Sequence, residues 1–388
     1  MVVIILFWIS VFLIIYGFAG YVVLLGLLCL FKHNVSKQNS MLSKDEDLPV
    51  LTLLISVYNE EMVIEEKLRN ALSLDYPKDK LEILVISDGT TDATEDKVKA
   101  FADKGVQLLK QEPRGGKTAA LNMAVPMARG EIIVFSDANS MYEKGSLQRL
   151  AMHFSQRDIG FVTGRTKYIS CSGLTTAGTT ERMYTRMELL IKRMECQVSS
   201  CVGADGAIFA IRKKLYLPLK AYDINDFVIP LNIIEQGYRG ILEEKAVCLE
   251  ESANGISGEF RRQVRITCRT IRAIFNNKNL LNPFKFPFFS FALFSHKLIK
   301  YMVPFFLMIA FLTNMAIVAT SSGYQILFAA QIIFYLFFIS GYLQRNKEDG
   351  FKLSRLVYAF VVVSAAMFIG WIKYFSGETY TTWQSERS

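Results

Sequence analysis

The chain has 388 residues, of which 51% are hydrophobic and 21% are charged, and its formal net charge is +8. This share of apolar side chains excludes a disordered chain. Their segregation argues against a wholly soluble protein, because residues 1–31 and 301–344 contain no Asp, Glu, Lys or Arg. Residues 255–300 hold nine Lys and Arg against one acidic residue, so the remainder of the chain is neutral overall.

Four apolar runs are long enough to cross a membrane, which takes about 20 residues in a helix. The first, residues 1–31, has no basic segment before it and is too long for a secretory signal. Ser321-Ser322-Gly323 divides the next apolar stretch into two helices. The sequence therefore predicts transmembrane helices at 1–31, 298–320, 324–344 and 356–372.

Basic residues beside these runs predict the orientation of the chain, because Lys and Arg gather on the cytoplasmic side. They follow the first run and lie between the last two, at Lys32, Lys37, Arg345, Lys347, Lys352 and Arg355. We therefore expect a multi-pass protein of the cell (inner) membrane, with a cytoplasmic middle domain and both termini outside. The six cysteines and three histidines show no zinc-ligand spacing, and we interpret the cysteines as reduced.

The middle domain begins with alternating strand and helix patterns. Short β-branched, apolar runs predict strands at 50–57, 81–87, 106–109 and 131–136, separated by helical patterns at 61–73, 91–102 and 117–129. This order predicts a doubly wound, mostly parallel sheet that binds ligands at the carboxyl ends of its strands. Three of these strands end at Glu60, Asp88 and Asp137.

Four short motifs over residues 50–140 carry a family resemblance. They are Tyr58-Asn59-Glu60, Ser87-Asp88-Gly89-Thr90-Thr91-Asp92, Lys117-x-x-Ala120-Leu121-Asn122 and Phe135-Ser136-Asp137-Ala138-Asn139. In this order and spacing they resemble the nucleotide-sugar half of membrane-embedded family 2 glycosyltransferases, which include cellulose, hyaluronan and poly-N-acetylglucosamine synthases. The resemblance implies a metal-dependent enzyme that takes a UDP-sugar. A donor diphosphate and lipid headgroups account for the basic residues at 255–300, so we expect no nucleic-acid partner.

The resemblance also implies how the chain is organised. A GT-A glycosyltransferase domain at 48–250 would follow the helix of residues 1–31, with a nucleotide-sugar half at 50–140 and an acceptor half at 141–250. Basic and amphipathic interface helices would occupy 251–297, and three transmembrane helices would occupy 298–376.

The donor site implied by the resemblance uses residues of the first four motifs. Asp88 would contact uracil, Tyr58 and Glu60 would lie around the base and ribose, and Lys117 would approach the donor. Asp92 is equally explained as a cap for the following helix. The segment Arg114–Thr118 resembles a phosphate-binding P-loop only in part, because that pattern requires Gly where the chain has Gln111.

Asp137-Ala138-Asn139 occupies the place of the family's D-x-D motif. Its two oxygen ligands suit a hard cation, Mg²⁺ or Mn²⁺, although the second carboxylate is replaced by an amide. Asp137 is the firmer metal ligand and Asn139 the second candidate. By itself the segment would also be explained as an Asx turn that closes a strand.

The acceptor half supplies the candidate catalytic base. Asn225-Asp226-Phe227 resembles the family's T-E-D motif, so Asp226 would be the general base that an inverting transfer requires. Asp223 is its main competitor, and an Asp at this position could also only cap a helix. The Gly203–Ala207 loop resembles the one beneath the acceptor sugar, where Asp205 could bind a hydroxyl, although a tight turn explains it as well.

The chain departs from the polymer synthases at their Q-x-x-R-W motif. The segment Arg262–Ile266 supplies Arg265 for the diphosphate and Arg262 for donor or acceptor, but Trp is absent, since Trp occurs only at 8, 371 and 383. An aromatic platform could instead come from Phe227, Phe260 or Tyr184. We interpret Arg269 and Arg272, on the same helix face, as contacts to lipid phosphates.

These observations predict an inverting glycosyltransferase that extends a growing glycan from a UDP-sugar at the cytoplasmic face of the bilayer, with or without translocation. The alternative is a single-step transferase for a lipid-linked acceptor, which the missing Trp favours. A non-catalytic transporter or scaffold is less favoured, because the apolar stretches 1–31 and 301–344 hold no charged residue of the kind that marks a transport path. The sequence leaves partner subunits and oligomeric state open.

Overall fold

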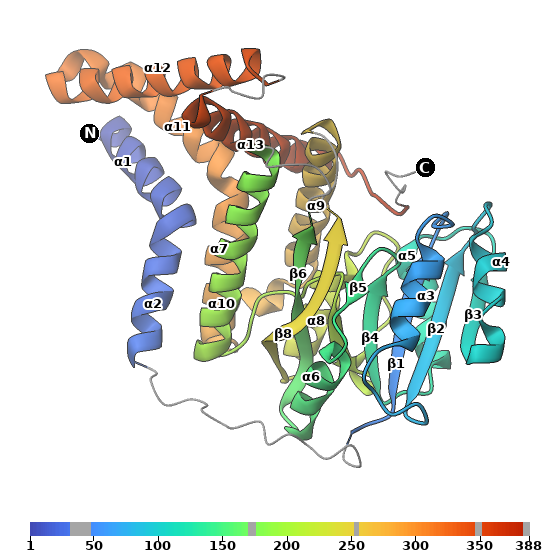
Figure 1. Cartoon of the computed structure of the whole chain (residues 1–388). Coiled ribbons are helices and arrows are strands. Elements are labelled where there is room, and N and C mark those ends of the chain that lie inside the picture. The colour runs from blue at the N-terminus through green and yellow to red at the C-terminus, as the bar shows by residue number, and fades with distance from the viewer. Residues whose placement is uncertain (32–47, 170–175, 252–255, 346–350, 383–388) are drawn as a thin grey trace.

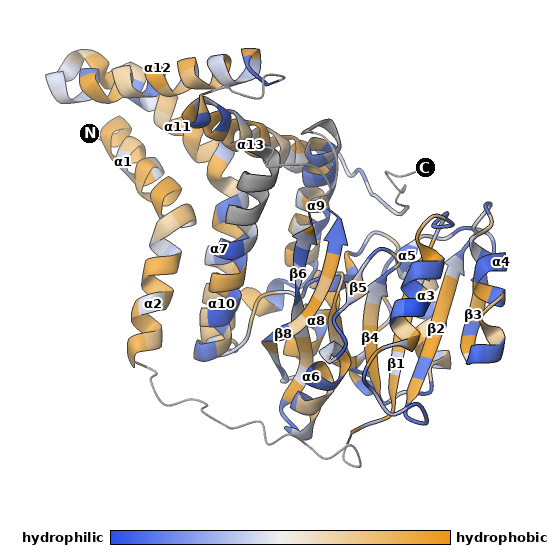
Figure 2. Ribbon diagram, in the orientation of Figure 1, coloured by the Kyte–Doolittle hydropathy of each residue, from blue (hydrophilic) through white to orange (hydrophobic). Residues whose placement is uncertain are grey.

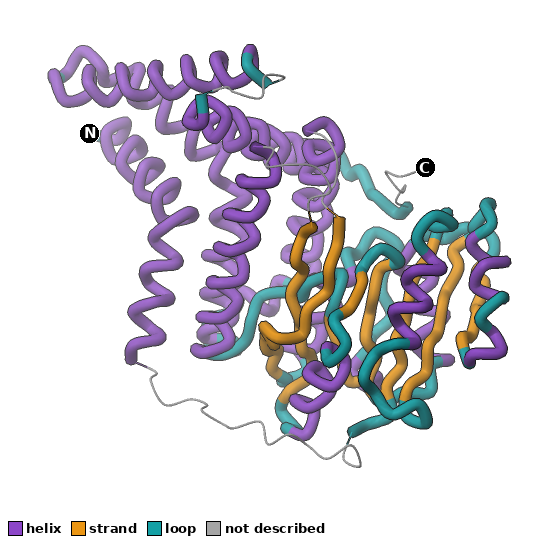
Figure 3. The backbone as a smooth tube through the Cα atoms, viewed as in Figure 1, coloured by secondary structure: helices purple, strands orange, loops and turns teal. Residues whose placement is uncertain are grey.

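The chain folds into a sheet-containing domain beside a group of long helices (Figure 1). A computed structural model describes residues 1–31, 48–169, 176–251, 256–345 and 351–382. Figure 3 shows the separation of the two parts, with the strands on one side of the molecule and the long helices on the other. Lys32, Lys37, Lys347 and Cys171, which entered the predictions above, lie outside the described residues.

The domain is built on one mixed sheet of eight strands in the described residues, in the order β3-β2-β1-β4-β7-β6-β8-β5. The first four strands of this order are parallel, and β7 is antiparallel to both of its neighbours. The strands are β1 (Leu51–Val57), β2 (Leu81–Asp88), β3 (Val106–Gln111), β4 (Ile132–Asp137), β5 (Met141–Tyr142), β6 (Ile159–Ile169), β7 (Phe209–Arg212) and β8 (Arg239–Glu251).

The strand order places the predicted donor residues at one edge of the sheet. From β1 the chain winds outward through β2 and β3, and then crosses back to β4 on the other side of β1. The register aligns Val57 with Ser87 and Ser56 with Asp137, so the carboxyl ends of the three strands lie level. Such a reversal of strand order is where doubly wound sheets bind ligands. The predicted parallel strands are therefore confirmed, and they meet as expected.

Helices bury both faces of the sheet. One apolar core lies under α3 (Ile64–Leu72), α4 (Thr94–Lys99) and α6 (Ser146–Met152), and its strand residues include the fully buried Leu53 and Ile55. The second core lies on the other face, where the alternate residue Leu54 packs. It is closed by α5 (Lys117–Met127), α8 (Asn225–Glu235) and parts of α9 (Ile256–Asn276) and α10 (Pro287–Ala292).

Four helical runs are long and apolar enough to cross a membrane: Val2–Phe31, Pro287–Thr320, Ser322–Leu343 and Lys352–Phe375. They comprise α1 (Val2–Ile15), α2 (Tyr21–Phe31), α10, α11 (Lys300–Ile317), α12 (Ser322–Leu343) and α13 (Lys352–Phe375), with π-helical turns at Tyr16–Gly20 and Leu293–Ile299. In Figure 2 most residues of these helices have hydrophobic colours, whereas α3 and α4 of the domain contain many hydrophilic residues. The prediction of one N-terminal and three C-terminal apolar helices is confirmed, and the chain is a membrane protein.

The second apolar run is longer than its sequence pattern indicated. It begins at Pro287 rather than at 298, because α10 continues through the π-helical turn into α11 without a break. Proline at the first helical position needs no amide partner, which explains the start of the helix. The Phe-rich segment before 298 therefore belongs to the same helical run as the predicted span.

A buried ionic cluster fastens α7 (Thr176–Val198) to two apolar runs. His296 of the π-helical turn lies between two carboxylates of α7, 3.1 Å from Glu188 and 2.8 Å from Glu195. Lys297 pairs with Glu188 at 2.8 Å, and the hydroxyl of Tyr21 donates to Glu195 at 2.9 Å. Although burial opposes it, the charges of His296 and Lys297 hold the pKa of Glu188 well below its usual range. The cluster ties the acceptor half to the membrane helices.

The end of the described chain returns to the domain. α13 packs along α12 and α9, where Tyr358 stacks on Phe338 and Trp371 meets Phe275. The tail beyond it contacts α5, because a Cβ at Gly116 would overlap the carbonyl oxygen of Thr381. The end of the described chain therefore lies against the domain. The sequence predicted both termini on the side of the membrane opposite the domain, and the location of the termini across a membrane stays a prediction.

Candidate active site

The metal candidate and the donor lysine meet at the switch point of the sheet. Asp137 ends β4, and Lys117 opens α5 directly after Gly116, whose φ of 88° favours glycine. The amine of Lys117 donates to the Asp137 carboxylate. Two residues twenty positions apart are thereby brought into one site, as the resemblance implied.

Asp88 is buried at the end of β2, and a glycine-rich loop surrounds its carboxylate. It accepts hydrogen bonds from the backbone amides of Gly115 and Gly116, at 2.8 and 2.9 Å, and from the side chain of Gln111 at 3.0 Å. The loop therefore wraps around a carboxylate rather than a phosphate, which explains why the P-loop pattern is incomplete. The role of Asp88 toward uracil stays a prediction.

Arg114 is a site residue that the sequence patterns did not single out. Its guanidinium lies 3.4 Å from the centroid of the Tyr58 ring, and its Nε lies 3.9 Å from the Asp88 carboxylate. Arginine stacks readily on an aromatic face, so it joins Tyr58 to Asp88. The sequence signal that could have identified Arg114 is its position directly before Gly115-Gly116.

The loops that follow β1 and β2 are fastened to each other. The Asn59 side chain accepts from the amide of Thr91 at 2.9 Å, and the amide of Glu60 donates to the hydroxyl of Thr94 at 2.8 Å. Asp92 accepts from the amide of Thr94 at 3.0 Å, where α4 begins. This contact supports the helix-cap interpretation of Asp92 and places Glu60 at the rim of the site.

α5 also holds the loop that leads to the candidate base. The Asn122 side chain brackets the backbone of Leu219, donating to its carbonyl at 2.7 Å and accepting from its amide at 2.8 Å. The hydroxyl of Thr118 donates to the carbonyl of Ala221 at 3.1 Å. The Lys117–Asn122 motif thus links the donor residues to the segment before α8.

Asp226 lies in the first turn of α8 and faces the site from the acceptor side. A Cβ at Gly206 would lie 3.1 Å from its Oδ2, so glycine there allows the 203–207 loop to approach closely. Burial raises the pKa of the Asp226 carboxyl, against the opposing charges of Lys117 and Arg269. Asp226 and Asp137 are near enough that each charge influences the other. The structure thus joins the donor and acceptor motifs.

Asp223, the alternative candidate for the general base, is hydrogen bonded within its own loop. Its carboxylate accepts from the amide of Lys220 at 2.8 Å, and burial raises its pKa. Arg269 of α9 donates to the carbonyls of Tyr222, at 3.0 Å, and of Asp223. Asp223 therefore closes a loop, which leaves Asp226 as the better candidate for the base.

Asp205 occupies a turn in which its carboxylate is already hydrogen bonded. It accepts from the amide and the hydroxyl of Thr166, both at 2.9 Å, and from the amide of Ala207 at 3.2 Å. These contacts favour the tight-turn interpretation. Its predicted role in binding an acceptor hydroxyl is not supported by this geometry.

The arginine stripe of α9 points toward the protein rather than toward lipid. Arg269 holds the loop before α8, and burial lowers its pKa to about 10. Arg272 donates to the carbonyl of Glu378 at 2.8 Å and lies over the Tyr222 and Tyr374 rings. The prediction that both arginines meet lipid phosphates is therefore wrong, because the C-terminal tail and the 222–223 loop cover them.

The two arginines assigned to the substrates lie near acidic and tail residues. Arg262 pairs with Glu259 at 3.3 Å, and the charge of Arg265 acts on Tyr380 of the tail. Of the possible aromatic platforms, Phe227 is 6% exposed and packs in the core, so it cannot stack on a sugar. Phe260 stays a candidate, and the side chain of Tyr184 lies outside the described structure.

The donor set fits a divalent cation that is shared with a phosphate ligand. Asp137 and Asn139 provide one carboxylate and one amide, and no cluster of three or more His, Cys, Asp or Glu suited to a metal occurs in the described residues. Mg²⁺ is commonly held by one or two carboxylates together with substrate phosphates. The residues present therefore fit Mg²⁺ or Mn²⁺ brought together with a diphosphate.

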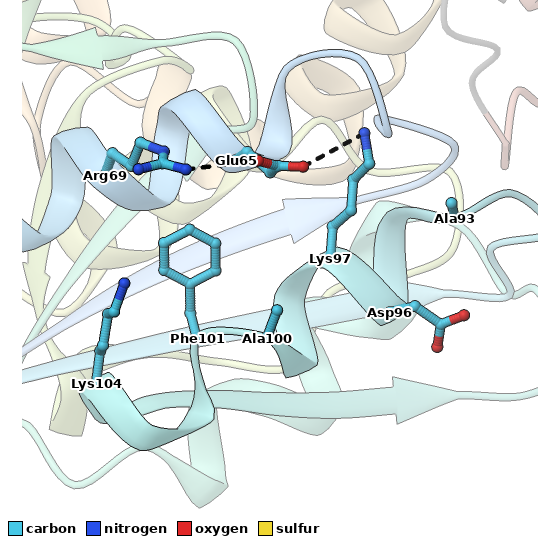
Figure 4. Close-up of a pocket in the computed structure, with 8 residues that line it drawn as sticks. All are labelled: Glu65, Arg69, Ala93, Asp96, Lys97, Ala100, Phe101 and Lys104. Atoms are coloured by element: carbon cyan, nitrogen blue, oxygen red, sulfur yellow. Dashed lines mark ion pairs between the residues drawn. The ribbon is translucent and has the colours of Figure 1, made fainter.

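A separate cavity of about 370 Å³ lies between α3 and α4 (Figure 4). Glu65 stands between two cations on its wall, 3.8 Å from Arg69 and 3.6 Å from Lys97. None of the predicted site residues lines it, and Glu65, Arg69 and Lys97 on its wall already pair with one another. We therefore assign the site to the carboxyl ends of the strands.

Comparison with known proteins identifies the family of the segment that carries the donor residues. Residues 52–216 match the family model described as glycosyl transferase family 2. This segment is a family 2 glycosyltransferase domain. The match ends at Tyr216, so α8 with Asp226 and α9 with Arg265 lie beyond it.

Curated relatives of this domain are glycosyltransferases by name. The probable glycosyltransferase YdaM of Bacillus subtilis is 31% identical over 148 residues, which are 37% of this chain and 34% of that protein. The poly-beta-1,6-N-acetyl-D-glucosamine synthase of Staphylococcus aureus is 25% identical over 227 residues, 57% of this chain and 54% of that protein. The chain thus spans between about a third and a half of the length of these two relatives.

A solved structure extends the similarity to the helices. The mannosyltransferase PcManGT from Pyrobaculum calidifontis, in complex with GDP-Man and Mn²⁺, aligns with a TM-score of 0.71 at 21% identity, covering 95% of this chain and 99% of that one. The GT-A-like fold with one N-terminal and three C-terminal apolar helices is therefore confirmed.

Proposed function

We propose that the chain is an inverting glycosyltransferase that moves a sugar from a UDP-sugar to a growing glycan at the cytoplasmic face of the membrane. The observation that carries this proposal is the position of Asp226. It approaches the Asp137–Lys117 pair from the acceptor side, next to Gly206. A base on one side of a diphosphate-binding edge is the arrangement that a direct displacement requires.

Each residue has a role in this displacement. Asp226 removes the proton of the acceptor hydroxyl, whose oxygen attacks the anomeric carbon as the bond to the diphosphate breaks. Lys117 and Arg265 stabilise the negative charge of the leaving nucleoside diphosphate. Asp88 and Tyr58 hold the base, and Arg114 keeps the two in contact. A cation held by Asp137 and Asn139 would supply further neutralisation of that charge.

A single-step transfer to a lipid-linked acceptor is the second candidate. The missing Trp of the polymer synthases and the buried Phe227 favour it, since both leave the acceptor side without an evident stacking platform. A relative 31% identical over 122 residues is the beta-monoglucosyldiacylglycerol synthase of a Nostoc species, whose name indicates a lipid acceptor. That match covers 30% of this chain and 26% of that protein.

Product length from the purified full-length protein separates the two candidates. Radiolabelled UDP-glucose, UDP-N-acetylglucosamine, UDP-galactose and GDP-mannose would be supplied one at a time, with Mn²⁺ and a total lipid extract in nanodiscs. Long chains from a UDP-sugar support the glycan proposal, and a single sugar on lipid supports the second candidate. Transfer from GDP-mannose alone would refute the UDP assignment, and no transfer from any donor would refute both candidates.

A further inference from the structure

Lys67 of α3 is a buried lysine directly behind the metal turn, the turn Asp137–Ser140 that carries both candidate metal ligands. It is 0% exposed, although lysine is almost never fully buried without a partner. Within the described residues, its amine donates to the carbonyl of Ser140 and lies 4.2 Å from the centroid of the Tyr142 ring. These partners are a carbonyl and a ring rather than a carboxylate. Burial lowers the pKa of Lys67 to about 7.

The core around Lys67 would accept an apolar side chain without this penalty. Its neighbours on the same helix face are the fully buried Ile64, Leu68 and Ala71. Burying a charge costs free energy unless the charged group is paired or hydrogen bonded. Packing alone therefore does not explain a lysine here, whereas its hydrogen bond to the Ser140 carbonyl does.

The opposite side of the same turn is held by β8. The hydroxyl of Ser140 donates to the carboxylate of Glu250, and β5 pairs with β8 through Met141 and Leu249. Asn70, one helical turn after Lys67, donates to the carbonyl of Tyr142 at 2.9 Å and accepts from its amide at 2.8 Å. The segment after Asn139 is thus hydrogen bonded to α3 on one side and to β8 on the other.

The hydrogen bonds from Lys67 and to Glu250 hold Ser140, the last residue of the metal turn. The amide of Ser140 donates to the carbonyl of Asp137 at 3.3 Å, so residues 137–140 form one closed turn. Ala138 is buried within it, whereas Asp137 and Asn139 are partly exposed. A fixed Ser140 therefore fixes the direction of the two ligand candidates. Partners behind metal ligands commonly set ligand orientation in this way.

We propose that Lys67 is a positioning residue that holds the turn Asp137–Ser140, so that Asp137 and Asn139 face a divalent cation at the donor diphosphate. The proposal rests on the function proposed above. The fixed turn compensates for the amide at 139, because a weaker ligand contributes more when its direction is set in advance.

The test measures cation binding separately from catalysis. Mn²⁺ would be titrated into full-length wild-type and Lys67→Met protein in nanodiscs and followed by electron paramagnetic resonance, with and without UDP. Methionine keeps the length of the side chain and removes the charge. We expect Lys67→Met to raise the half-saturating Mn²⁺ concentration in the presence of UDP about 10- to 100-fold. UDP binding without metal should be unchanged, because Asp88 and Tyr58 lie outside the turn.

Lys78→Met is the matched control. Lys78 is an exposed lysine that also donates to a backbone carbonyl, that of Leu72, and it contacts no site residue. Its substitution should leave Mn²⁺ binding as in the wild type. For Lys67→Met, activity should recover toward the wild-type value at high Mn²⁺ concentration, which a merely structural defect would not show.

Three outcomes overturn the proposal. Wild-type affinity for Mn²⁺ in Lys67→Met, with or without a lowered melting temperature, refutes the role of Lys67 and leaves the proposed function intact. Wild-type protein that binds neither Mn²⁺ nor UDP refutes both. Should Lys67→Met fail to fold, Lys67→Leu replaces it, since leucine matches the buried neighbours Ile64 and Leu68 and donates no hydrogen bond to the Ser140 carbonyl; an unchanged Mn²⁺ affinity in that variant would also contradict the proposal.

Discussion

Replacement of Asp226 by asparagine is expected to abolish most of the transfer while the fold and the donor site persist. The amide has the shape of the carboxylate but cannot accept a proton. The donor residues Asp88, Lys117 and Asp137 belong to other elements, so binding of the nucleotide should be largely retained. The expected loss is therefore in kcat rather than in KM for the donor.

The magnitude follows from the role assigned to Asp226. Proton removal by a placed side chain contributes typically about 10²- to 10⁴-fold to a rate. At about 1.36 kcal/mol for each factor of ten, this is about 2.7 to 5.4 kcal/mol of barrier. A loss below tenfold would be too small for the general base of the reaction.

The stability of Asp226→Asn should be equal to or higher than that of the wild type, although its activity falls. Burial raises the pKa of Asp226 in the folded protein, so the stability that the protonated group contributes at low pH is lost as pH rises through its folded pKa. Asparagine has no proton to lose. Asp226→Asn should therefore be at least as stable as the wild type at neutral pH, and the difference should vanish below about pH 3.9, the ordinary pKa of aspartate.

The assay compares turnover, UDP binding and thermal unfolding of purified wild-type, Asp226→Asn and Asp223→Asn proteins. Asp223 is the matched control, because it is also buried and lies three residues earlier, but its carboxylate only accepts from the Lys220 amide. Asparagine can accept the same bond, so Asp223→Asn should retain activity within about tenfold of the wild type. Undiminished turnover in Asp226→Asn, or the large loss in Asp223→Asn instead, would refute the base assignment.

Three further predictions concern the metal and the tail. A chelator should abolish transfer, and Mn²⁺ or Mg²⁺ should restore it, because Asp137 and Asn139 provide oxygen ligands; full activity in EDTA would exclude a metal. Ending the chain after Gly377 should lower the KM for the donor several-fold without changing kcat, because the tail lies against Gly116, beside Asp88; a raised KM would show that the tail completes the site. A protease should remove a C-terminal tag from the same side of sealed vesicles on which it cleaves the domain, and protection of the tag there would restore the opposite topology.

The local elements and the donor motifs could be predicted from the amino-acid sequence. Short β-branched apolar runs are typical of buried strands and runs of about 20 apolar residues are typical of membrane helices, so β1, β2 and β4 and the four long helices followed from length and composition. Polar residues directly after buried strands must lie at one edge of a parallel sheet. Asp88 and Asp137 were therefore expected together, and the register confirms it.

Contacts between residues far apart in the chain become visible only in the folded protein. No sequence pattern connects Lys67 with Ser140, or Thr381 with Gly116, because periodicity carries no information on a single long-range contact. The same holds for Arg269, whose place on a basic helix face suggested lipid. Its guanidinium instead binds the carbonyls that precede α8, because the fold brings those carbonyls, rather than phosphates, within reach.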